Sequence, residues 1–449
     1  MSKIITFDVG TNFDDALFRV VKEKDKENRI KTFYGKLKND GLPGGRASSM
    51  IPDFTMDQLE EYVKKCHDNG ITFNYLINPL CMGQMETDPK QAPVLRKIIH
   101  DIYDIGVRQF TVNSPLLVKY LKDTFCDVWV TLGLFAYPVT LQQVQMWINW
   151  GVDEVTLDHS FNRDFKLLEK TLRMYKDSNV ALRLIANNLC LKECTFRLAH
   201  GAFSSHNDAS GFVLDYSMTN CAYKKITQPT YFLTSEWIRP EDVHYYEELC
   251  EKTGNRNFSL KLVDRTRSTE FISRTMEAYL DERFDGNLLD ILNWHEKSKM
   301  ADIEARKSMK IKNMEYMNMP VMGLWGRVMC FPDIIIDNRK LDGFIDDFVK
   351  GSSCKDKLCQ GSILEEGSKV EGSCAHCSAW AKKAVTGNAQ EIAEWKQVAE
   401  TLFKTLQNGD FAKPLGAPPT GMPPYGMTPP TGMPPFGATP PAGTPPFEK

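Results

Sequence analysis

Short apolar runs alternate with amphipathic segments along the first 285 residues of the chain. Nine runs have strand-like composition: residues 4–9, 31–37, 71–77, 107–113, 128–134, 152–158, 180–186, 231–235 and 258–264. The segments between them place apolar residues three and four positions apart, a spacing typical of helices that bury one face. Strands alternating with helices predict parallel strands joined by crossover helices. About eight such units favour a closed TIM-like (β/α) barrel, of the α/β class, over an open sheet.

The nine runs exceed the eight strands of such a barrel, so we expect one or two runs at the N-terminus to lie outside it or not to be strands. The barrel is predicted over residues 1–285 and a helical, Met-rich extension over residues 286–350. Residues 351–412 are expected to form a Cys-rich metal-binding segment followed by one amphipathic helix.

Residues 413–449 contain three copies of an 11-residue unit, APPTGMPPYGM, TPPTGMPPFGA and TPPAGTPPFEK. A composition so rich in Pro and Gly cannot form a packed core, which predicts a disordered tail. Each copy offers PP followed by Tyr or Phe. The tail is therefore expected to be inert, to dock a protein partner that has aromatic grooves, or to be itself modified or processed.

Composition and charge indicate which partners and which cellular compartment to expect. A net charge of −3 over 449 residues gives no global basic footprint for nucleic acid. The N-terminus lacks the apolar segment of a signal peptide, and no apolar run approaches the roughly 18 residues of a membrane span. We therefore expect a cytoplasmic protein without a membrane partner. In that compartment the twelve cysteines are predicted to be buried, reactive or metal-bound rather than disulfide-linked.

Chemistry in barrels of this kind gathers at the C-terminal ends of the strands, here called the barrel mouth. The polar residues at those predicted ends are Asn78, Cys81, Asn113, Ser114, Asp158, His159, Asn187, Asn188, Cys190, Cys194, Glu236, Asp264 and Arg265.

Two groups of cysteines have the spacing of metal ligands. Cys190 and Cys194 form C-x3-C after a predicted strand, with Cys221 downstream and Cys81 as the best fourth ligand. Such soft thiolates suit zinc or an iron–sulfur cluster, and a reactive thiol such as Cys190 beside His200 is the alternative. The second group, Cys354, Cys359, Cys374 and Cys377, has C-x4-C and C-x2-C spacing close to that of zinc ribbons. Zinc is the simplest assignment for it, and a second iron–sulfur cluster is the rival.

Three segments, FNYLINPLCMGQME (73–86), GVDEVTLDHSFNRDF (151–165) and LIANNLCLKECTFRLAHGAFSSH (184–206), resemble the peptidase U32 (collagenase-like protease) family. The likeness covers roughly residues 55–380 and leaves out the Pro/Gly tail. It implies a TIM-like barrel and, in several branches of the family, an oxygen-sensitive 4Fe–4S cluster. Carried over to this chain, the cluster ligands are Cys81, Cys190, Cys194 and Cys221. Some members are described as proteases, whereas other branches are oxygen-independent hydroxylases of RNA bases or of an aromatic ring.

Hydroxylase-type chemistry is favoured over proteolysis, because a cysteine bound to iron cannot attack a carbonyl, and the chain lacks both HExxH and G-x-S-x-G. The expected substrate is a peptide, an RNA base or a small aromatic or anionic metabolite. A cysteine- or metal-dependent peptidase, and a non-catalytic iron–sulfur scaffold that docks partners through the tail, remain the alternatives. A homo- or hetero-oligomer is compatible with each of these functions.

Catalytic roles are predicted for Asp158, His159, Arg197 and His200, and substrate-binding roles for Arg183, Asn187, Glu236, Arg239 and Arg265. For the histidines a purely structural role is the alternative. For the arginines the alternative is a salt bridge to a neighbouring carboxylate.

Overall fold

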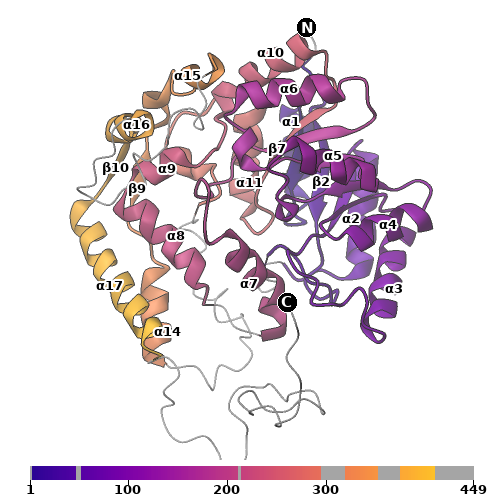
Figure 1. Cartoon of the computed structure of the whole chain (residues 1–449), viewed down its shortest axis with the longest axis horizontal. Helices are drawn as coiled ribbons and strands as arrows, with labels where there is room; N and C mark the ends of the chain where they lie inside the picture. The colour runs from indigo at the N-terminus through magenta and orange to yellow at the C-terminus, as the bar shows by residue number, and fades with distance from the viewer. Residues whose placement is uncertain (1–2, 47–51, 211–213, 295–318, 352–374, 410–449) are drawn as a thin grey trace, which may run out of the picture.

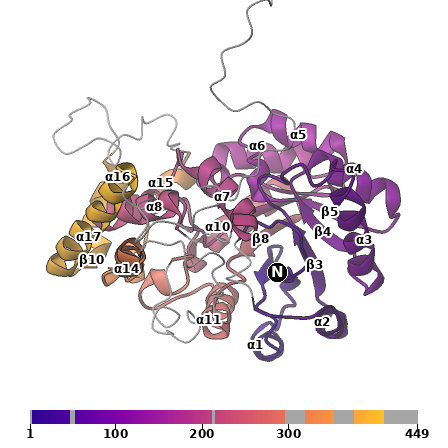
Figure 2. The ribbon, with the colours of Figure 1, turned by 90° about the horizontal axis from the view of Figure 1, so that it is seen from below.

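The computed structural model describes residues 3–46, 52–210, 214–294, 319–351 and 375–409. Within these ranges eight parallel strands close into a barrel in the order β1 to β8, with helices around the outside (Figures 1 and 2). β1 pairs with β8 to complete the closure, with Asp8 opposite Lys261. The TIM-like barrel predicted from the alternation of strands and helices is therefore confirmed.

The strands of the barrel are β1 (Thr6–Gly10), β2 (Ile30–Gly35), β3 (Thr72–Ile77), β4 (Gln109–Val112), β5 (Trp129–Leu132), β6 (Glu154–Thr156), β7 (Ala181–Ile185) and β8 (Phe258–Leu262). Its helices are α1 (Ala16–Lys24), α2 (Met56–Asp68), α3 (Gln91–Asp104), α4 (Pro115–Thr124), α5 (Leu141–Trp150), α6 (Phe165–Tyr175), α7 (Arg197–Ser210), α8 (Tyr216–Thr227), α9 (Thr230–Thr234), α10 (Val243–Thr253) and α11 (Thr269–Leu280). Short 3-10 turns follow two of the strands, η2 (Leu134–Ala136) after β5 and η3 (His159–Phe161) after β6, and two of the helices, η4 (Pro240–Asp242) after α9 and η5 (Leu288–Asp290) after α11.

The run 231–235 is not a strand, and both N-terminal runs belong to the barrel as β1 and β2. The expectation that the surplus strand lies at the N-terminus is therefore wrong. Tyr231–Thr234 fall in the buried helix α9, which begins after Pro229. A short apolar run suits a buried helix as well as a buried strand, so its composition alone could not separate the two.

Local sequence signals set the ends of the barrel helices. Thr55 and Thr140 each form a capping box with a glutamine three residues later, at the starts of α2 and α5. Ser114 caps α4 with its hydroxyl, and Pro115 occupies the first turn. Gly151 ends α5 at a φ of 110°, a conformation that favours glycine. The capping residues at the helix starts mark where the loops that follow the strands end. These loops form the barrel mouth.

Polar side chains fill the inside of the barrel, whereas the main apolar core lies between the strands and the helices. Arg183 on β7 bonds Asp8 at 3.0 Å and lies 3.1 Å from Glu154. Thr131 donates a hydrogen bond to Glu154, and Ser259 donates one to Asp8. This interior network, defined by Asp8, Glu154 and Arg183, supplies each buried charge with an opposite charge and a hydrogen bond.

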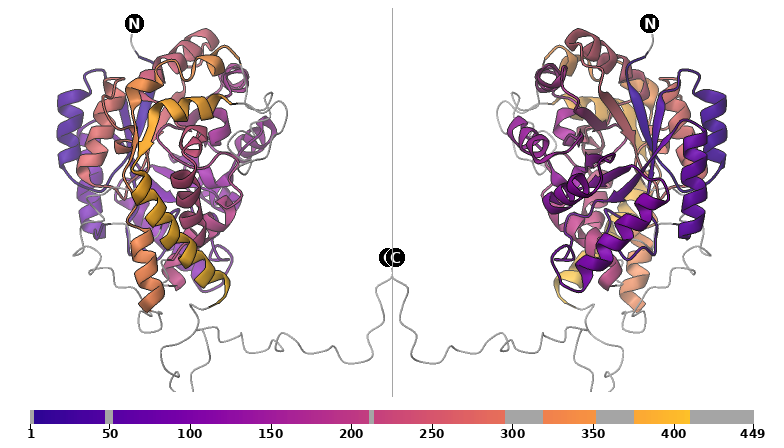
Figure 3. Two further views of the ribbon diagram at one scale, coloured as in Figure 1. Left: turned by 90° about the vertical axis from the view of Figure 1, so that its left-hand side faces the viewer. Right: turned by 90° about the vertical axis from the view of Figure 1, so that its right-hand side faces the viewer.

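The C-terminal part adds α14 (Met319–Val328), β9 (Ile334–Ile336), η7 (Asn338–Leu341), α15 (Asp346–Val349), α16 (His376–Ala384), β10 (Val385–Gly387) and α17 (Ala389–Gln407). β9 and β10 pair antiparallel, a sheet that the sequence analysis did not predict. α14 and α17 lie side by side and pack against α8 (Figures 1 and 3). Together these three helices bury a second apolar core, separate from that of the barrel, which includes Ala222, Ile226, Val328, Trp395 and Phe403.

Arg163 ties the barrel to the extension. Its guanidinium donates to the carbonyl oxygens of Leu233 and Trp237 at 2.6 and 3.0 Å. It also stacks over the rings of Trp237 and Phe344, 4.6 and 4.8 Å from their centroids. In the ranges that the structure describes, no helix is both long and apolar enough to span a bilayer.

Candidate active site at the barrel mouth

Asp158, just after β6, is bonded to one other predicted catalytic residue, Arg197. One of its carboxylate oxygens caps η3 by accepting from the backbone of Ser160, and the other accepts from Arg197 at 3.0 Å. The Arg197 guanidinium lies over the ring of Tyr137, 4.1 Å from its centroid. The structure thus brings Asp158 and Arg197 together across the mouth and adds Tyr137, which the sequence analysis missed.

His159 contacts the cysteine loop through Asn188. The Asn188 side-chain amide donates to His159 Nε2 at 2.8 Å and to Cys190 Sγ at 3.3 Å. Burial lowers the pKa of His159, against the opposing effect of Asp158. The ring is therefore neutral near pH 7, with Nε2 as acceptor and the proton on Nδ1.

Three of the predicted ligand thiols lie close to one another. Burial raises the pKa of Cys190 to about 11, with further contributions from the charges of Cys221 and Cys194. Burial also raises the pKa of Cys194, and the charge of Cys221 adds to this. Lys225, one helical turn after Cys221 on α8, donates to Cys221 Sγ at 2.7 Å. Cys221 acts on both Cys190 and Cys194, and Cys194 acts on Cys190, so we call these three residues the thiol cluster.

His200 links the two helices that surround the thiol cluster. Its Nδ1 lies 3.3 Å from the carboxylate of Asp215, which caps α8 by accepting from the backbone of Met218. Burial lowers the pKa of His200, although the charge of Asp215 opposes this. The pair therefore holds α7 and α8 together where Cys221 enters the site.

Cys81 follows β3 on a loop that packs against α7. The backbone N–H groups of Leu80 and Cys81 donate to the Ser205 hydroxyl at 2.9 and 3.4 Å. A side chain on Gly201 would come within 2.9 Å of Leu80, so this glycine permits the close packing. The thiol of Cys81 is exposed. Among the described residues, no three His, Cys, Asp or Glu side chains are arranged to hold a metal ion.

Arg265, just after β8, is a buried cation without a partner. Only 4% of its surface is exposed, and its Nε and Nη2 groups have no hydrogen-bond acceptor. The adjacent Asp264 is paired with Arg46 at 3.1 Å. Although burial opposes it, the charges of Arg46, Arg267 and Arg265 lower the pKa of Asp264 to about 2. Asp264 is thus ionised and already engaged, which leaves the Arg265 donors unmatched.

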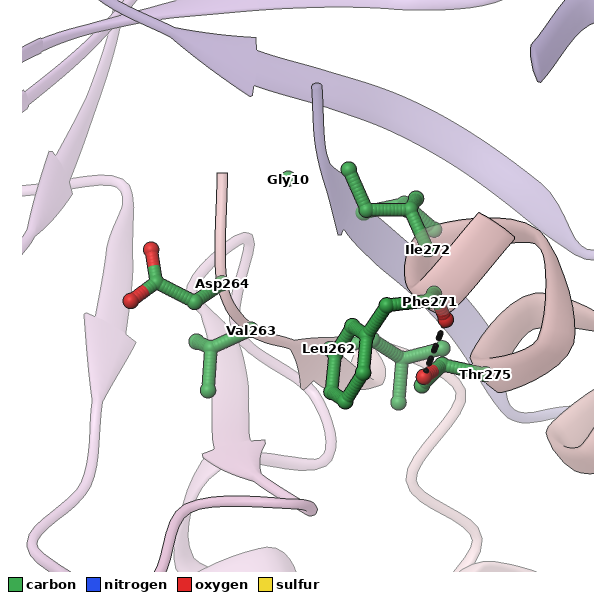
Figure 4. A pocket seen from close by; sticks show the side chains of 8 residues that line it. Gly10, Leu262, Val263, Asp264, Phe271, Ile272 and Thr275 are labelled. Atoms are coloured by element: carbon green, nitrogen blue, oxygen red, sulfur yellow. Dashed lines mark hydrogen bonds between the residues drawn. The ribbon is translucent and has the colours of Figure 1, made fainter. Parts of the chain in front are cut away.

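Figure 4 shows the end of β8, where the Asp264 side chain points away from Phe271 and Thr275 of α11. The small cavity on the α11 side of the strand has a volume of about 10 Å³. This is space for one water at most, and it is lined mainly by apolar side chains. This cavity is therefore too small to hold a substrate.

Four of the five predicted substrate-binding residues have protein partners. Arg183 belongs to the interior network. Asn187 is fully buried and bonds the backbone of Val263 and Ile291, fastening the end of β7 to the end of β8. Glu236 pairs with Lys192 of the cysteine loop. Arg239 bonds Asp242 through two nitrogens and faces Asn338 of the extension. Substrate binding by these four stays a prediction, and Arg265 alone of the five lacks a partner.

The second cysteine group lies mostly outside the described residues. Cys377 is buried in α16, whereas Cys354, Cys359 and Cys374 fall in ranges that the structure does not describe. The predicted zinc or second cluster at these four cysteines stays a prediction, as does the disordered tail.

The sequence analysis missed Lys225, Asp215, Arg46 and Lys261. A signal existed for Lys225, because it lies four residues after Cys221 in an amphipathic stretch. No sequence spacing could indicate Arg46, since it reaches Asp264 from a Gly-rich loop more than two hundred residues away.

Fold and site together define a TIM-like barrel protein with a thiol cluster and an orphaned arginine at its mouth. The model of peptidase family U32 matches residues 42–174, which confirms the resemblance to that family. The chain is 28% identical over 277 residues to the uncharacterized protease MJ1657 of Methanocaldococcus jannaschii, covering 61% of this chain and 79% of that protein.

Among solved structures, the chain is similar to the U32 peptidase Mk0906, with a TM-score of 0.42 and 17% identity, covering 59% of this chain and 94% of that one. It is also similar to D-psicose 3-epimerase from Clostridium cellulolyticum H10, with a TM-score of 0.32 and 13% identity, covering 68% and 96%.

Proposed function

We propose that the chain is an enzyme that holds a 4Fe–4S cluster at Cys81, Cys190, Cys194 and Cys221 and modifies an anionic substrate beside it. The electrostatic influence of Cys221 on both Cys190 and Cys194 carries the proposal. Four thiolates are the usual ligand set of such a cluster. Cys81 would complete the set from its loop on α7.

The charges around the thiol cluster fit an anionic metal centre. Lys225 donates to Cys221, and the positive charges of Lys225 and Arg46 act on Cys190. The charges of Lys225 and Arg197 act on Cys194. These cations offset the negative charge that four thiolates bring to a partly buried site.

Arg265 is the anchor proposed for the substrate. Its unmatched Nε and Nη2 donors suit a carboxylate or phosphate, which a guanidinium binds through two hydrogen bonds. The side-chain oxygens of Asn78 and Asn113, at the ends of β3 and β4, also lack partners and can accept from a substrate. A side chain on Gly133 would lie 2.5 Å from Asn113 Oδ1, so glycine at this position leaves space for the Asn113 amide.

Two side chains are positioned to handle protons. Neutral His159 presents a basic Nε2 now occupied by Asn188, and rotation of that amide would free it to accept a proton. The Arg197–Asp158 pair lies beside it and can stabilise negative charge that develops on a substrate oxygen. When bound, the cluster supplies a Lewis-acidic iron or an electron-transfer centre.

Proteolysis is the second candidate, because the similar Methanocaldococcus jannaschii protein is named as an uncharacterized protease. A thiol nucleophile needs a base that contacts it and a lowered pKa. Cys190 is exposed, and its Sγ accepts a hydrogen bond from the Asn188 amide rather than contacting a base. This environment favours the hydroxylase-type function, with a peptide, an RNA base or a small aromatic or anionic metabolite as substrate.

The test is anaerobic purification of the full chain with iron and sulfide analysis and electron paramagnetic resonance. We expect iron and sulfide in the native protein and their loss in Cys190→Ser and Cys194→Ser. Cys66→Ser and Cys250→Ser are matched controls, because these two thiols are buried in helices away from the mouth. Full iron and sulfide in Cys190→Ser would refute the proposal. Casein cleavage by metal-free protein, abolished by one Cys→Ala substitution, would establish the peptidase instead.

A further inference from the structure

Lys261, on β8, is a second buried cation without a hydrogen-bonded partner. Its register opposite Asp8 places it inside the barrel, and 6% of its surface is accessible. Its ammonium lies 3.7 Å from the centroid of the Tyr34 ring. In the described part of the chain it has no hydrogen bond and no carboxylate within salt-bridge distance. By contrast Lys36, also buried, is bonded to Asp40.

The nearest carboxylates are already satisfied without Lys261. Asp8 accepts from Arg183 and Ser259, and Glu154 accepts from Thr131 and lies beside Arg183. Burial, reinforced by the charges of Arg183 and Arg265, lowers the pKa of Lys261 well below its ordinary value, and the carboxylates only partly oppose this. A buried lysine of this kind spends more of its time as the neutral, nucleophilic amine.

Lys261 and Arg265 lie on the same stretch of chain and share Tyr34 as a neighbour. The Tyr34 hydroxyl donates to the carbonyl of Leu262 at 2.8 Å, which fixes the ring beneath Lys261. A side chain on Gly10 would lie 2.8 Å from the backbone nitrogen of Arg265 and 3.0 Å from the Tyr34 hydroxyl. Glycine at this position therefore lets β1, Tyr34 and the Arg265 segment meet at one corner of the mouth.

We propose that Lys261 forms an imine with a small carbonyl compound whose anionic group is bound by Arg265. The neutral amine adds to the carbonyl carbon, so that a carbon–nitrogen bond forms. Both protons of the amine then pass from nitrogen to oxygen, the carbon–nitrogen double bond forms as the carbon–oxygen bond breaks, and water leaves. This inference deepens the proposed function by naming a substrate class, and it shares with it the anion site at Arg265.

Reductive trapping tests the inference without any assay of turnover. The full chain, anaerobically purified or metal-free, is incubated with pyruvate or pyridoxal 5′-phosphate and cyanoborohydride, then digested and analysed by mass spectrometry. We expect Lys261 to be labelled at least about tenfold above Lys36, because each unit of lowered pKa gives tenfold more free amine. Labelling by pyruvate identifies a carboxylate as the anion, and labelling by pyridoxal 5′-phosphate alone identifies a phosphate.

Variants separate the parts of the inference. Arg265→Met should reduce labelling of Lys261 about tenfold at low probe concentration and leave the exposed Lys97 unchanged. Lys261→Arg keeps the charge and should abolish the label at this site, with folding checked by circular dichroism. If neither probe labels Lys261 in the folded protein, the inference is overturned. If Arg265→Met does not change the labelling of Lys261, the anion site at Arg265 is overturned. Iron and sulfide counts on the same samples report separately on the cluster.

Discussion

Arg183 lies on β7 and Arg265 lies just after the neighbouring strand β8. The two are buried to nearly the same extent, yet their surroundings are opposite. Arg183 meets Asp8, Glu154 and Thr156 and has every nitrogen engaged. Arg265 leaves two nitrogens unmatched. A buried charge with its partners stabilises the fold, whereas one without partners is costly to the fold and available to a ligand. The comparison separates the satisfied interior network around Arg183 from the unmatched guanidinium donors at the mouth.

Breaking the interior network should give the largest effect. Arg183→Leu leaves Asp8 and Glu154 as uncompensated buried charges, so we expect the free energy of unfolding to fall by about 3–5 kcal/mol. Urea unfolding followed by circular dichroism measures it. Arg265→Leu is the matched variant at the mouth and should change the free energy by less than about 1 kcal/mol, because no partner is lost. Equal losses in both variants would contradict the division between interior and mouth.

Asn187 lies at the boundary between the two regions and should give the next largest effect. Asn187→Ala removes the side-chain bonds to Val263 and Ile291 and leaves buried backbone groups unpaired. We expect a loss of about 1–3 kcal/mol in the free energy of unfolding by the same measurement. Asn78→Ala serves as the control, since its side-chain oxygen has no partner to lose. If Asn187→Ala leaves the free energy of unfolding unchanged, Asn187 is not structural and its predicted role in substrate binding is favoured.

The link between α8 and α17 tests whether the mouth depends on the second core. Tyr223 on α8 donates to Glu400 on α17 at 2.6 Å, and its ring packs edge-on against Phe403. Tyr223→Phe keeps the ring and removes the hydrogen bond, so we expect a loss of about 0.5–1.5 kcal/mol. If α8 positions Cys221, the iron content of Tyr223→Phe should fall together with its stability. Tyr120→Phe, on the outer helix α4, is expected to leave iron content unchanged.

The smallest expected effect is a change with pH. Because burial lowers the pKa of His159, the unfolded chain binds a proton at this residue more readily than the folded chain does. The stability contributed by this neutral histidine is therefore present above the unfolded pKa and is lost as the pH falls below it. Between pH 7 and pH 5 the thermal midpoint of His159→Gln should fall less than that of the native protein. An identical fall in both would show that the ring is free to protonate in place.

The sequence was sufficient for the barrel and for the residues that gather at the mouth, because periodicity and strand ends are local properties. It placed Asp158, Arg197, Cys190, Cys194 and Cys221 in one region without any structure. The sequence could not show that Arg183 has carboxylate partners and Arg265 has none, because those partners come from strands far apart in the chain. The partner of Asp264 is likewise invisible, since Arg46 reaches it from a distant loop.

The placement of α8 has a consequence for how such a protein can change. One wall of the mouth is anchored in a layer of helices that the barrel does not need for its own closure. Substitutions on the side of α17 that packs against α8 can therefore shift the helix that carries Cys221 while the strands stay as they are. The reactivity of the site can therefore change with little loss of stability in the eight-stranded barrel.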